Sequence, residues 1–280
     1  MGQGSSVFKR FILLGLLLGA TANARAAGDA PLWEAGLGVA GISFPDYRGS
    51  DQQRGYLVPL PYLIYRGDRL RLDRHGLRGL LFSSERLALD LSMDGAVPVN
   101  SKNNDARQGM PDLDPAIEFG PSLDYTLQDS PERLVRLRLA VRTLLATNLR
   151  RLHQEGWIAN PNLNISSGGR WNTGLSVGPL FATRAYHAYY YDVAPAYATA
   201  DRPAYTARGG YSGFRLALSL SRRYRRFWLG GFLRYDDLHG AVFADSPLVK
   251  RKSALMAGFG IAWVLNQSQR RVPRTLADAQ

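Results

Sequence analysis

The sequence predicts an all-β protein, a closed antiparallel transmembrane β-barrel of about 12 strands, with a range of 10 to 14, after a cleaved signal peptide. Three observations predict this fold class. The N-terminus has the layout of an export signal, and no later stretch is apolar and long enough for a transmembrane helix. Segments of about ten residues also alternate between large apolar side chains and small or charged ones, which is typical of membrane-spanning strands.

The beginning of the chain has the three parts of a Sec signal peptide. Lys9 and Arg10 precede an apolar run over residues 11–20, and "TANARAA" then offers small residues for cleavage after Ala24 or Ala26. The apolar run is too short to cross a bilayer as a permanent helix. We therefore expect export and divide the chain into a signal peptide, a barrel domain and a polar C-terminal tail, at residues 1–26, 27–268 and 269–280.

Composition narrows the class of protein and of partner. The 280 residues include no cysteine, 45% are hydrophobic and 21% are charged, so disulfides play no part and disorder is not expected. The formal charge of +12 falls to +9 when residues 1–26 are removed, because these contain Lys9, Arg10 and Arg25 and no acid. Export favours anionic envelope partners, namely outer-membrane lipid, lipopolysaccharide or murein, over nucleic acid.

Four strands are expected before residue 97, at 33–44, 56–65, 69–81 and 86–94. In the second of these, "YLVPLPYLIY", two prolines predict an edge or an irregular strand, because proline cannot donate to a sheet ladder. In the fourth, "RLALDLSMD", leucine and methionine alternate with Ala88, Asp90, Ser92 and Asp94. The third strand, like the later one at 155–167, has the weakest alternation.

The later segments repeat the pattern with more aromatic residues, and they include 116–127, 133–143, 155–167, 171–181, 189–198, 214–221 and 255–265. One face of these segments is large and apolar, and the other is rich in glycine, alanine, serine and charges. A secreted soluble β-sandwich is the alternative, but its polar face would usually carry long side chains. The small face fits the inside of a narrow barrel. Aromatic residues near segment ends are expected to form the interfacial girdles: Trp33, Tyr65, Tyr125, Trp171, Tyr189, Tyr224, Trp228, Tyr235 and Trp263.

The stretch "RLVRLRLAVRT" predicts an ionic ladder inside the barrel. If its aliphatic residues face lipid, Arg136, Arg138 and Arg142 point into the lumen, and the preceding strand offers Glu118 and Asp124 on its inward face. We expect these five side chains to form a cross-strand ladder with a structural role. The alternative is an arginine-lined pore that selects anions, although small barrels are usually filled by their own side chains.

No catalytic, cofactor or metal site is expected. The histidines, His75, His153, His187 and His239, do not fall in a metal-ligand spacing. The motif "YDDLH" at 235–239 brings two carboxylates near a histidine, as an outer-membrane protease or acylhydrolase could use, but a polar loop is the favoured interpretation. The sequence contains no glycine-rich phosphate loop and no nucleophile elbow.

Four segments carry a resemblance to a known family: "YRGSDQQRGYLVPLPYLIYRGDRLRLD" at 47–73, "DLDPAIEFGPSLDY" at 112–125, "YYDVAPAYATADRPAY" at 190–205 and "GGFLRYDDLHGAVFADSPLVKRKSALMAGFGIAWVL" at 230–265. They resemble the MltA-interacting protein family, also called MipA/OmpV, over nearly the whole mature chain. The most specific part is "SPLV" followed by a glycine-rich final strand. One departure is that the chain continues after Leu265 through "NQSQRRVPRTLADAQ", so the C-terminal assembly signal usual for such barrels is expected to be internal.

The resemblance implies an outer-membrane barrel that is not an enzyme. The founding member is regarded as a scaffold joining a murein hydrolase to a murein synthase, and other members are linked to adhesion and to stress or antibiotic response. The expected function is therefore a scaffold or interaction protein in peptidoglycan biogenesis. The alternatives are a small pore or ligand-binding channel and an adhesin-like surface protein.

Loop positions follow from the expected strand count. With both termini in the periplasm, the segments 45–55, 199–212 and 238–252 are expected outside, and 97–112 is expected on the periplasmic side. The last segment is long for a periplasmic turn. It is either a docking loop or a sign that the number of strands before it is off by one.

Overall fold

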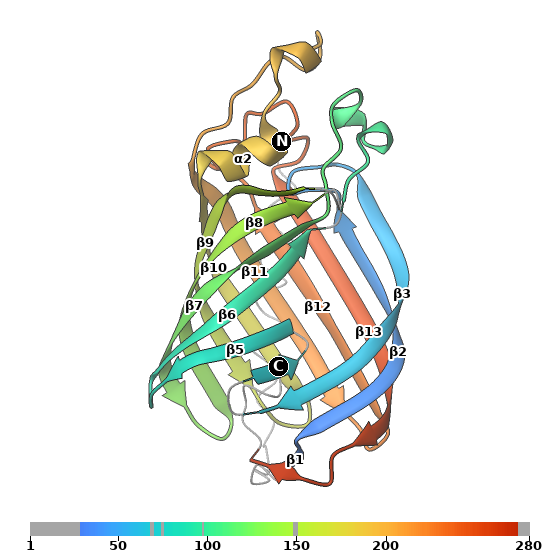
Figure 1. The fold of residues 1–280 in the computed structure, drawn as a ribbon, viewed down its shortest axis with the longest axis vertical. Coiled ribbons are helices and arrows are strands. Elements are labelled where there is room, and N and C mark those ends of the chain that lie inside the picture. The colour runs from blue at the N-terminus through green and yellow to red at the C-terminus, as the bar shows by residue number, and fades with distance from the viewer. Residues whose placement is uncertain (1–28, 68–69, 74–75, 97, 148–150, 274–280) are drawn as a thin grey trace, which may run out of the picture.

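The chain folds into one closed barrel of twelve antiparallel strands (Figure 1). The computed structural model describes residues 29–67, 70–73, 76–96, 98–147 and 151–273, so the predicted signal peptide lies outside the described residues. The predicted fold class is confirmed. Around the barrel the strands follow one another in chain order, from β2 to β13, and β13 closes the barrel against β2.

The strands of the barrel are β2 (Trp33–Pro45), β3 (Gln53–Arg66), β4 (Leu70–Asp73), β5 (Gly76–Ser83), β6 (Leu87–Ala96), β7 (Ala116–Asp129), β8 (Arg133–Thr147), β9 (Leu152–Ser167), β10 (Asn172–Ala182), β11 (Gly210–Arg223), β12 (Phe227–Asp237) and β13 (Ser253–Gln267). Outside the barrel, β1 (Ala30–Pro31) pairs with β14 (Arg271–Val272), so part of the predicted polar tail is ordered against the start of the described chain. The helical elements are η1 (Ser101–Asn103), η2 (Asp105–Arg107), α2 (Arg184–Tyr191) and η3 (Pro195–Tyr197).

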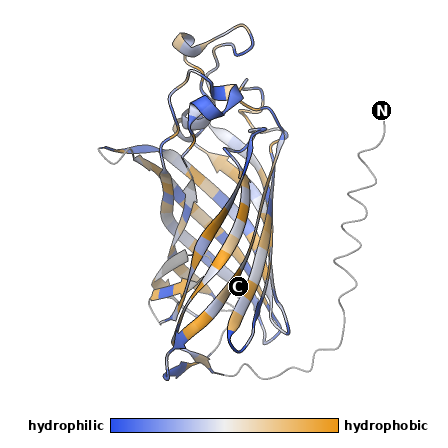
Figure 2. Ribbon diagram, turned by 90° about the vertical axis from the view of Figure 1, so that its right-hand side faces the viewer, coloured by the Kyte–Doolittle hydropathy of each residue, from blue (hydrophilic) through white to orange (hydrophobic). Residues whose placement is uncertain are grey.

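The two faces of the barrel wall have the chemistry that the alternation predicts. Large apolar side chains point outward and stay exposed, as do Leu57 at 77% and Phe259 at 68% of their surface. Inward positions of β7 are small or charged and are buried, among them Ser122 and Asp124. Figure 2 shows the hydrophobic residues along the barrel wall and the hydrophilic ones gathered at its ends. A wall of this kind buries its apolar face in lipid and satisfies its backbone by strand pairing.

The two ends of the barrel differ in their connections. Short turns at 84–86, 130–132, 168–171 and 224–226 lie at one end, together with β1 and β14; we call this the turn end (Figure 1). Long segments lie at the other end, at 46–52, 98–115, 183–209 and 238–252; we call them the cap.

Residues 98–112 belong to the cap, so the prediction that this segment lies at the opposite end of the barrel from the other long loops is wrong. Asn104 donates a hydrogen bond to Asp46 at 2.8 Å, and Arg202 donates to the carbonyl oxygens of Ala106 and Gln108 at 3.0 and 2.9 Å. These contacts hold the segment beside the loops that were expected outside. The physical reason is the split of the predicted strand 69–81, because β4 and β5 form a short hairpin and the chain reverses its direction once more than expected.

The predicted strand at 189–198 is also wrong, which leaves the total at twelve. Residues 184–191 form α2, whose N-cap is Thr183 with its hydroxyl oxygen accepting from the backbone N–H of Tyr186. Alternating tyrosine and alanine suggested a strand. In the structure these residues form a helix, and its tyrosines pack against other parts of the cap and against the barrel wall, as Tyr191 does on Phe243 and Tyr186 on Glu118. No helix in the described part of the chain is long and apolar enough to cross a membrane.

The cap has its own hydrophobic core. Tyr191 stacks on Phe243 with ring centroids 3.8 Å apart, and its hydroxyl donates to the carbonyl oxygen of Arg48 at 2.8 Å. Gly156 lets the helix approach the barrel, because it has a φ of 106° and a Cβ there would lie 2.4 Å from the backbone nitrogen of Tyr186. The fully or largely buried apolar residues of the cap core are Tyr47, Val99, Ala106, Leu113, Tyr191, Val193, Ala207, Leu238, Ala241, Phe243 and Leu248.

Two of the predicted girdle aromatics lie elsewhere. Trp228 points into the lumen, where its ring lies 6.0 Å from that of Tyr62, and Tyr189 packs in the cap against Tyr190. Both belong to aromatic-rich stretches in which sequence spacing does not distinguish an outward from an inward position. Among the residues predicted for the girdles, those that are exposed on the outward face are Trp33, Tyr65, Tyr125, Tyr235 and Trp263.

Candidate functional site

The lumen side of β7 and β8 brings the five residues of the expected ladder together. The Arg138 guanidinium donates two hydrogen bonds of 2.6 Å to the Asp124 carboxylate, and Arg136 lies 3.9 Å from the same carboxylate. One level nearer the cap, Arg142 donates to Glu118 at 3.1 Å. Paired, hydrogen-bonded charges of this kind are stable in a narrow interior where single charges would be costly.

The ladder is joined to the cap through Glu118. The Tyr186 hydroxyl of α2 donates to this carboxylate at 2.6 Å. This hydrogen bond attaches α2, which covers the barrel mouth, to β7 of the barrel wall. The sequence did not predict this contact, since Tyr186 lies 68 positions from Glu118 and no local pattern connects them.

Other ionic groups of the lumen were not expected as partners. Asp236 is paired with Arg215 at 2.7 Å and with Arg48 at 2.9 Å. At the turn end, Glu34 is paired with Arg66 and Arg223, each at 2.7 Å. Arg215 and Asp236 lie directly opposite each other on the neighbouring strands β11 and β12. Closure of the barrel brings Arg223 of β11 to Glu34 of β2, because β13 pairs with β2.

Asparagines on β9 form a polar row beside the ladder. The amide of Asn162 donates to the side-chain oxygen of Asn160 at 3.0 Å, and the Ser176 hydroxyl donates to Asn162 at 3.3 Å. Asn164 donates to the same oxygen of Asn162. This row continues the polar inner surface from β8 to β10, and its signal in the sequence is the spacing of the asparagines at every second residue.

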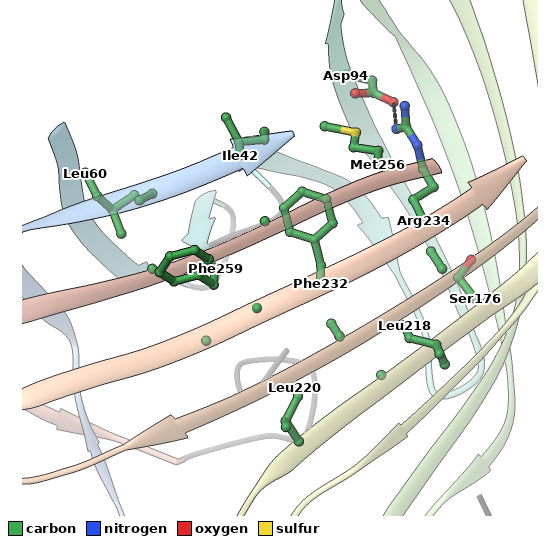
Figure 3. A pocket seen from close by; sticks show the side chains of 18 of the residues that line it. Ile42, Leu60, Asp94, Ser176, Leu218, Leu220, Phe232, Arg234, Met256 and Phe259 are labelled. Atoms are coloured by element: carbon green, nitrogen blue, oxygen red, sulfur yellow. Dashed lines mark ion pairs between the residues drawn. The ribbon is translucent and has the colours of Figure 1, made fainter. Parts of the chain in front are cut away.

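A cavity of about 780 Å³ occupies the middle of the lumen (Figure 3). Its polar side includes Asp94, Arg138, Arg142 and Arg234, with the asparagine row next to them. Its apolar side comes from the strands β2, β3, β12 and β13 and includes Ile42, Val58, Leu60, Trp228, Phe232 and Met256. The inner surface is therefore polar on one side and apolar on the other.

The motif "YDDLH" does not form a joint catalytic group. Asp236 points into the lumen and is held by two arginines, whereas Asp237 and His239 contact each other at the exposed edge of the cap. Among the described residues there is no cluster of three or more His, Cys, Asp or Glu side chains that could hold a metal ion.

A histidine and a serine of the cap do lie within hydrogen-bond distance. The His187 Nε2 atom is 2.9 Å from the Ser212 hydroxyl, and its Nδ1 atom is 2.6 Å from the carbonyl oxygen of Arg208. Burial lowers the pKa of His187, and the positive charge of Arg48 lowers it further, while the hydrogen bond to Arg208 raises it. Both side chains are completely buried, so a substrate has no access, and the pair serves to hold α2 against β11.

The turn end carries an excess of exposed positive charge. Seven exposed arginines lie on its turns and strand ends, against four exposed acids among the described residues there. The arginines are Arg86, Arg133, Arg170, Arg225, Arg226, Arg270 and Arg271, and the acids are Asp29, Glu85, Asp129 and Glu132. We call these arginines the rim. Such a ring of cations attracts anionic surfaces.

Comparison with known proteins gives one family and several distant barrels. The family model "MltA-interacting protein MipA" matches residues 37–265. No curated protein matches the sequence significantly. Solved structures with similar folds include a bacterial polysaccharide outer membrane secretin, with 10% identity, 83% of this chain and 99% of that chain covered, and a TM-score of 0.42.

Two further solved structures are similarly distant. The NanC porin has 8% identity, with 82% of this chain and all of that chain covered, and a TM-score of 0.39. OmpT, an outer membrane protein of Vibrio cholerae, has 9% identity, with 87% and 99% covered and a TM-score of 0.35. Similarities at this level do not extend any activity of those proteins to this chain.

Proposed function

This chain belongs to the MltA-interacting protein family, and on that basis we propose that it is a noncatalytic scaffold in peptidoglycan biogenesis whose contacts are made at the turn end. The protein is an outer-membrane β-barrel. Barrels of this class have short periplasmic turns and longer extracellular loops. The turn end then faces the periplasm, where murein and its enzymes lie, and the cap faces outward.

The observation that carries the proposal is the arginine rim. Murein and acidic protein surfaces are anionic, and arginine binds carboxylates with two parallel hydrogen bonds. A murein hydrolase is the first proposed protein partner, in keeping with the name of the family, and a murein synthase is the second. Lipopolysaccharide and outer-membrane lipid are the proposed surroundings of the wall. The ladder of Glu118, Asp124, Arg136, Arg138 and Arg142 has, in this proposal, the structural role of holding the lumen together.

A crosslinking experiment in cells tests the proposal. A photo-crosslinking amino acid at Arg225 or Arg170 should capture murein hydrolase or synthase, whereas the same group at Lys102 in the cap should not. The Arg225→Glu and Arg226→Glu double variant should weaken binding to isolated murein, and the Arg251→Glu and Lys252→Glu double variant at exposed positions of the cap is its charge-matched control. Equal capture from both ends, or murein binding unchanged by the rim variant, contradicts the proposal.

A small channel is the second candidate, and the lumen cavity is the observation that favours it. Two features oppose free flow through this lumen. The cap core covers the outer mouth, and inside the lumen Arg234 of β12 forms an ion pair with Asp94 of β6, which is not a neighbouring strand. We expect no conductance from the purified protein in planar bilayers, and stable single-channel steps would favour the channel.

A further inference from the structure

The barrel wall is incompletely paired between β3 and β6. Strand β3 pairs with β2 from Gln53 to Tyr65, but on its other side only Tyr65 and Arg66 pair with β4. Strand β6 pairs with β7 along its whole length, yet it pairs with β5 only over residues 88–90. In the part of the chain that is described, residues 53–64 and 91–96 thus have one edge without a neighbouring strand.

The unpaired edge of β3 is adapted to having no neighbour. In an antiparallel ladder, successive residues direct their backbone groups to opposite sides. Arg66 donates to the carbonyl oxygen of Leu32 on the β2 side, and the register is continuous, so Pro59 and Pro61 face the unpaired side. Proline has no backbone N–H. The two prolines therefore leave no unsatisfied hydrogen-bond donor at their positions on this unpaired edge.

On β6 one edge donor is satisfied locally. Arg86 accepts from Thr126 on the β7 side, which places Gly95 on the unpaired side. Its backbone N–H donates to the carboxylate of Asp94 at 2.9 Å. Unsatisfied backbone groups are costly in the hydrocarbon region, so these features stabilise an opening in the wall.

Space at these edges is open to the cavity. Val58 lies at an inward position of β3 but is 39% exposed. The cavity is lined by Val58 and Leu60 from one edge and by Ser92 and Asp94 from the other, so it extends to the opening.

The polar side of the cavity has a cation with unused hydrogen-bonding capacity. Arg234 is 28% exposed, and its ion pair with Asp94 is long, at 3.8 Å. Arg142 shares the same carboxylate at 4.0 Å and has a closer partner in Glu118. A guanidinium has five N–H donors, and no hydrogen bond from Arg234 occurs within the described residues. Figure 3 shows Arg234 beside Asp94, with Phe232 next along the same strand and Leu60 and Ile42 farther away.

We propose that this cavity binds a single-chain amphiphile with an anionic head group, which enters from the bilayer through the opening between β3 and β6. The head group lies at Arg234, and the chain lies along Ile42, Val58, Leu60 and Phe232. The cavity volume of about 780 Å³ is within the range of small-ligand sites. An amphiphile fits because the cavity combines an apolar wall with a cation that has free donors.

Binding of palmitate to the folded barrel in lipid nanodiscs tests the ligand class. Val58→Trp should fill the cavity and weaken binding about tenfold or more, whereas Leu57→Trp, on the lipid-facing side of the same strand, should not. Arg234→Gln should weaken palmitate binding about tenfold while binding of hexadecanol, which has no charge, changes little. Arg226→Gln at the rim is the control. Absence of saturable palmitate binding, or equal binding by all four variants, overturns the proposal.

Lateral access has its own test, because the chain contains no cysteine. Single cysteines at Ser92, beside the opening, and at Ser176, on the fully paired wall, both line the cavity. A maleimide linked to a phospholipid should react with Ser92→Cys much faster than with Ser176→Cys. The reaction rate of each variant with a small water-soluble maleimide measures its accessibility from water, and the rate with the lipid-linked reagent is corrected by dividing by it. Equal rates with the lipid-linked reagent, after that correction, overturn access from the bilayer.

Discussion

Asp124 and Arg138 show how a sequence pattern becomes a contact inside the barrel. Alternation put both residues on the inward face, and antiparallel pairing of β7 with β8 placed them directly opposite each other. The sequence predicted which residues would share the lumen because their facing depends only on a period of two. It did not predict Arg215 with Asp236, because residues 235–239 were interpreted as a polar loop, and it did not predict Glu34 with Arg223, because that pair depends on barrel closure.

Removal of one partner of the main pair should destabilise the barrel. Arg138→Gln leaves the buried Asp124 carboxylate without its two strongest hydrogen bonds, and we expect a loss of roughly 3 kcal/mol in the free energy of unfolding. Arg133→Gln, at the exposed start of the same strand, should change it little. Urea unfolding in lipid vesicles measures both, and equal losses contradict a structural role for the ladder.

The buried histidine of the cap predicts a pH dependence. The pKa of His187 is lowered in the folded protein, so the folded state resists protonation. Cap stability should be constant above about pH 6.5, where the unfolded histidine is also neutral, and should fall as the pH drops below that value. Proteolysis of the 183–209 segment should accelerate between pH 7 and 5. His187→Gln should remove this dependence, and His239→Gln, which is exposed, should keep it.

At the scale of the element, the regular strands could be predicted and the interruptions could not. Strands such as β7, β8 and β13 have long alternation with a clear apolar face. The hairpin of β4 and β5 is too short to show a period, and α2 has tyrosines whose spacing also fits a strand. Pro59 and Pro61 predicted an edge or an irregular strand, and β3 is unpaired along most of the side that they face.

The facing of β11 gives a direct prediction. Leu218 points to lipid and Ser219 points to the lumen, one residue apart on the same strand. Leu218→Arg should cost about 2 to 4 kcal/mol near the bilayer midplane, while Ser219→Arg should be tolerated much better. Equilibrium unfolding of the two variants decides the matter, and equal effects would show that the facing is misassigned.

For the whole molecule, closure of the barrel accounts for the behaviour expected on isolation. Every strand except the edges of β3 and β6 is hydrogen bonded on both sides, so the barrel should resist unfolding in detergent. The mature protein should migrate faster on gels before boiling than after it, and it should fractionate with the outer membrane. Recovery in the soluble periplasm would be incompatible with this fold.

The orientation of the barrel is the central claim, because it places the arginine rim next to murein and the cap outside the cell. The most direct measurement is labelling of single cysteines in intact cells with a thiol reagent that does not cross the outer membrane. The account predicts that Asn103→Cys in the cap is labelled at once and that Arg225→Cys at the rim is labelled only after permeabilisation. Immediate labelling of Arg225→Cys with protection of Asn103→Cys would contradict it.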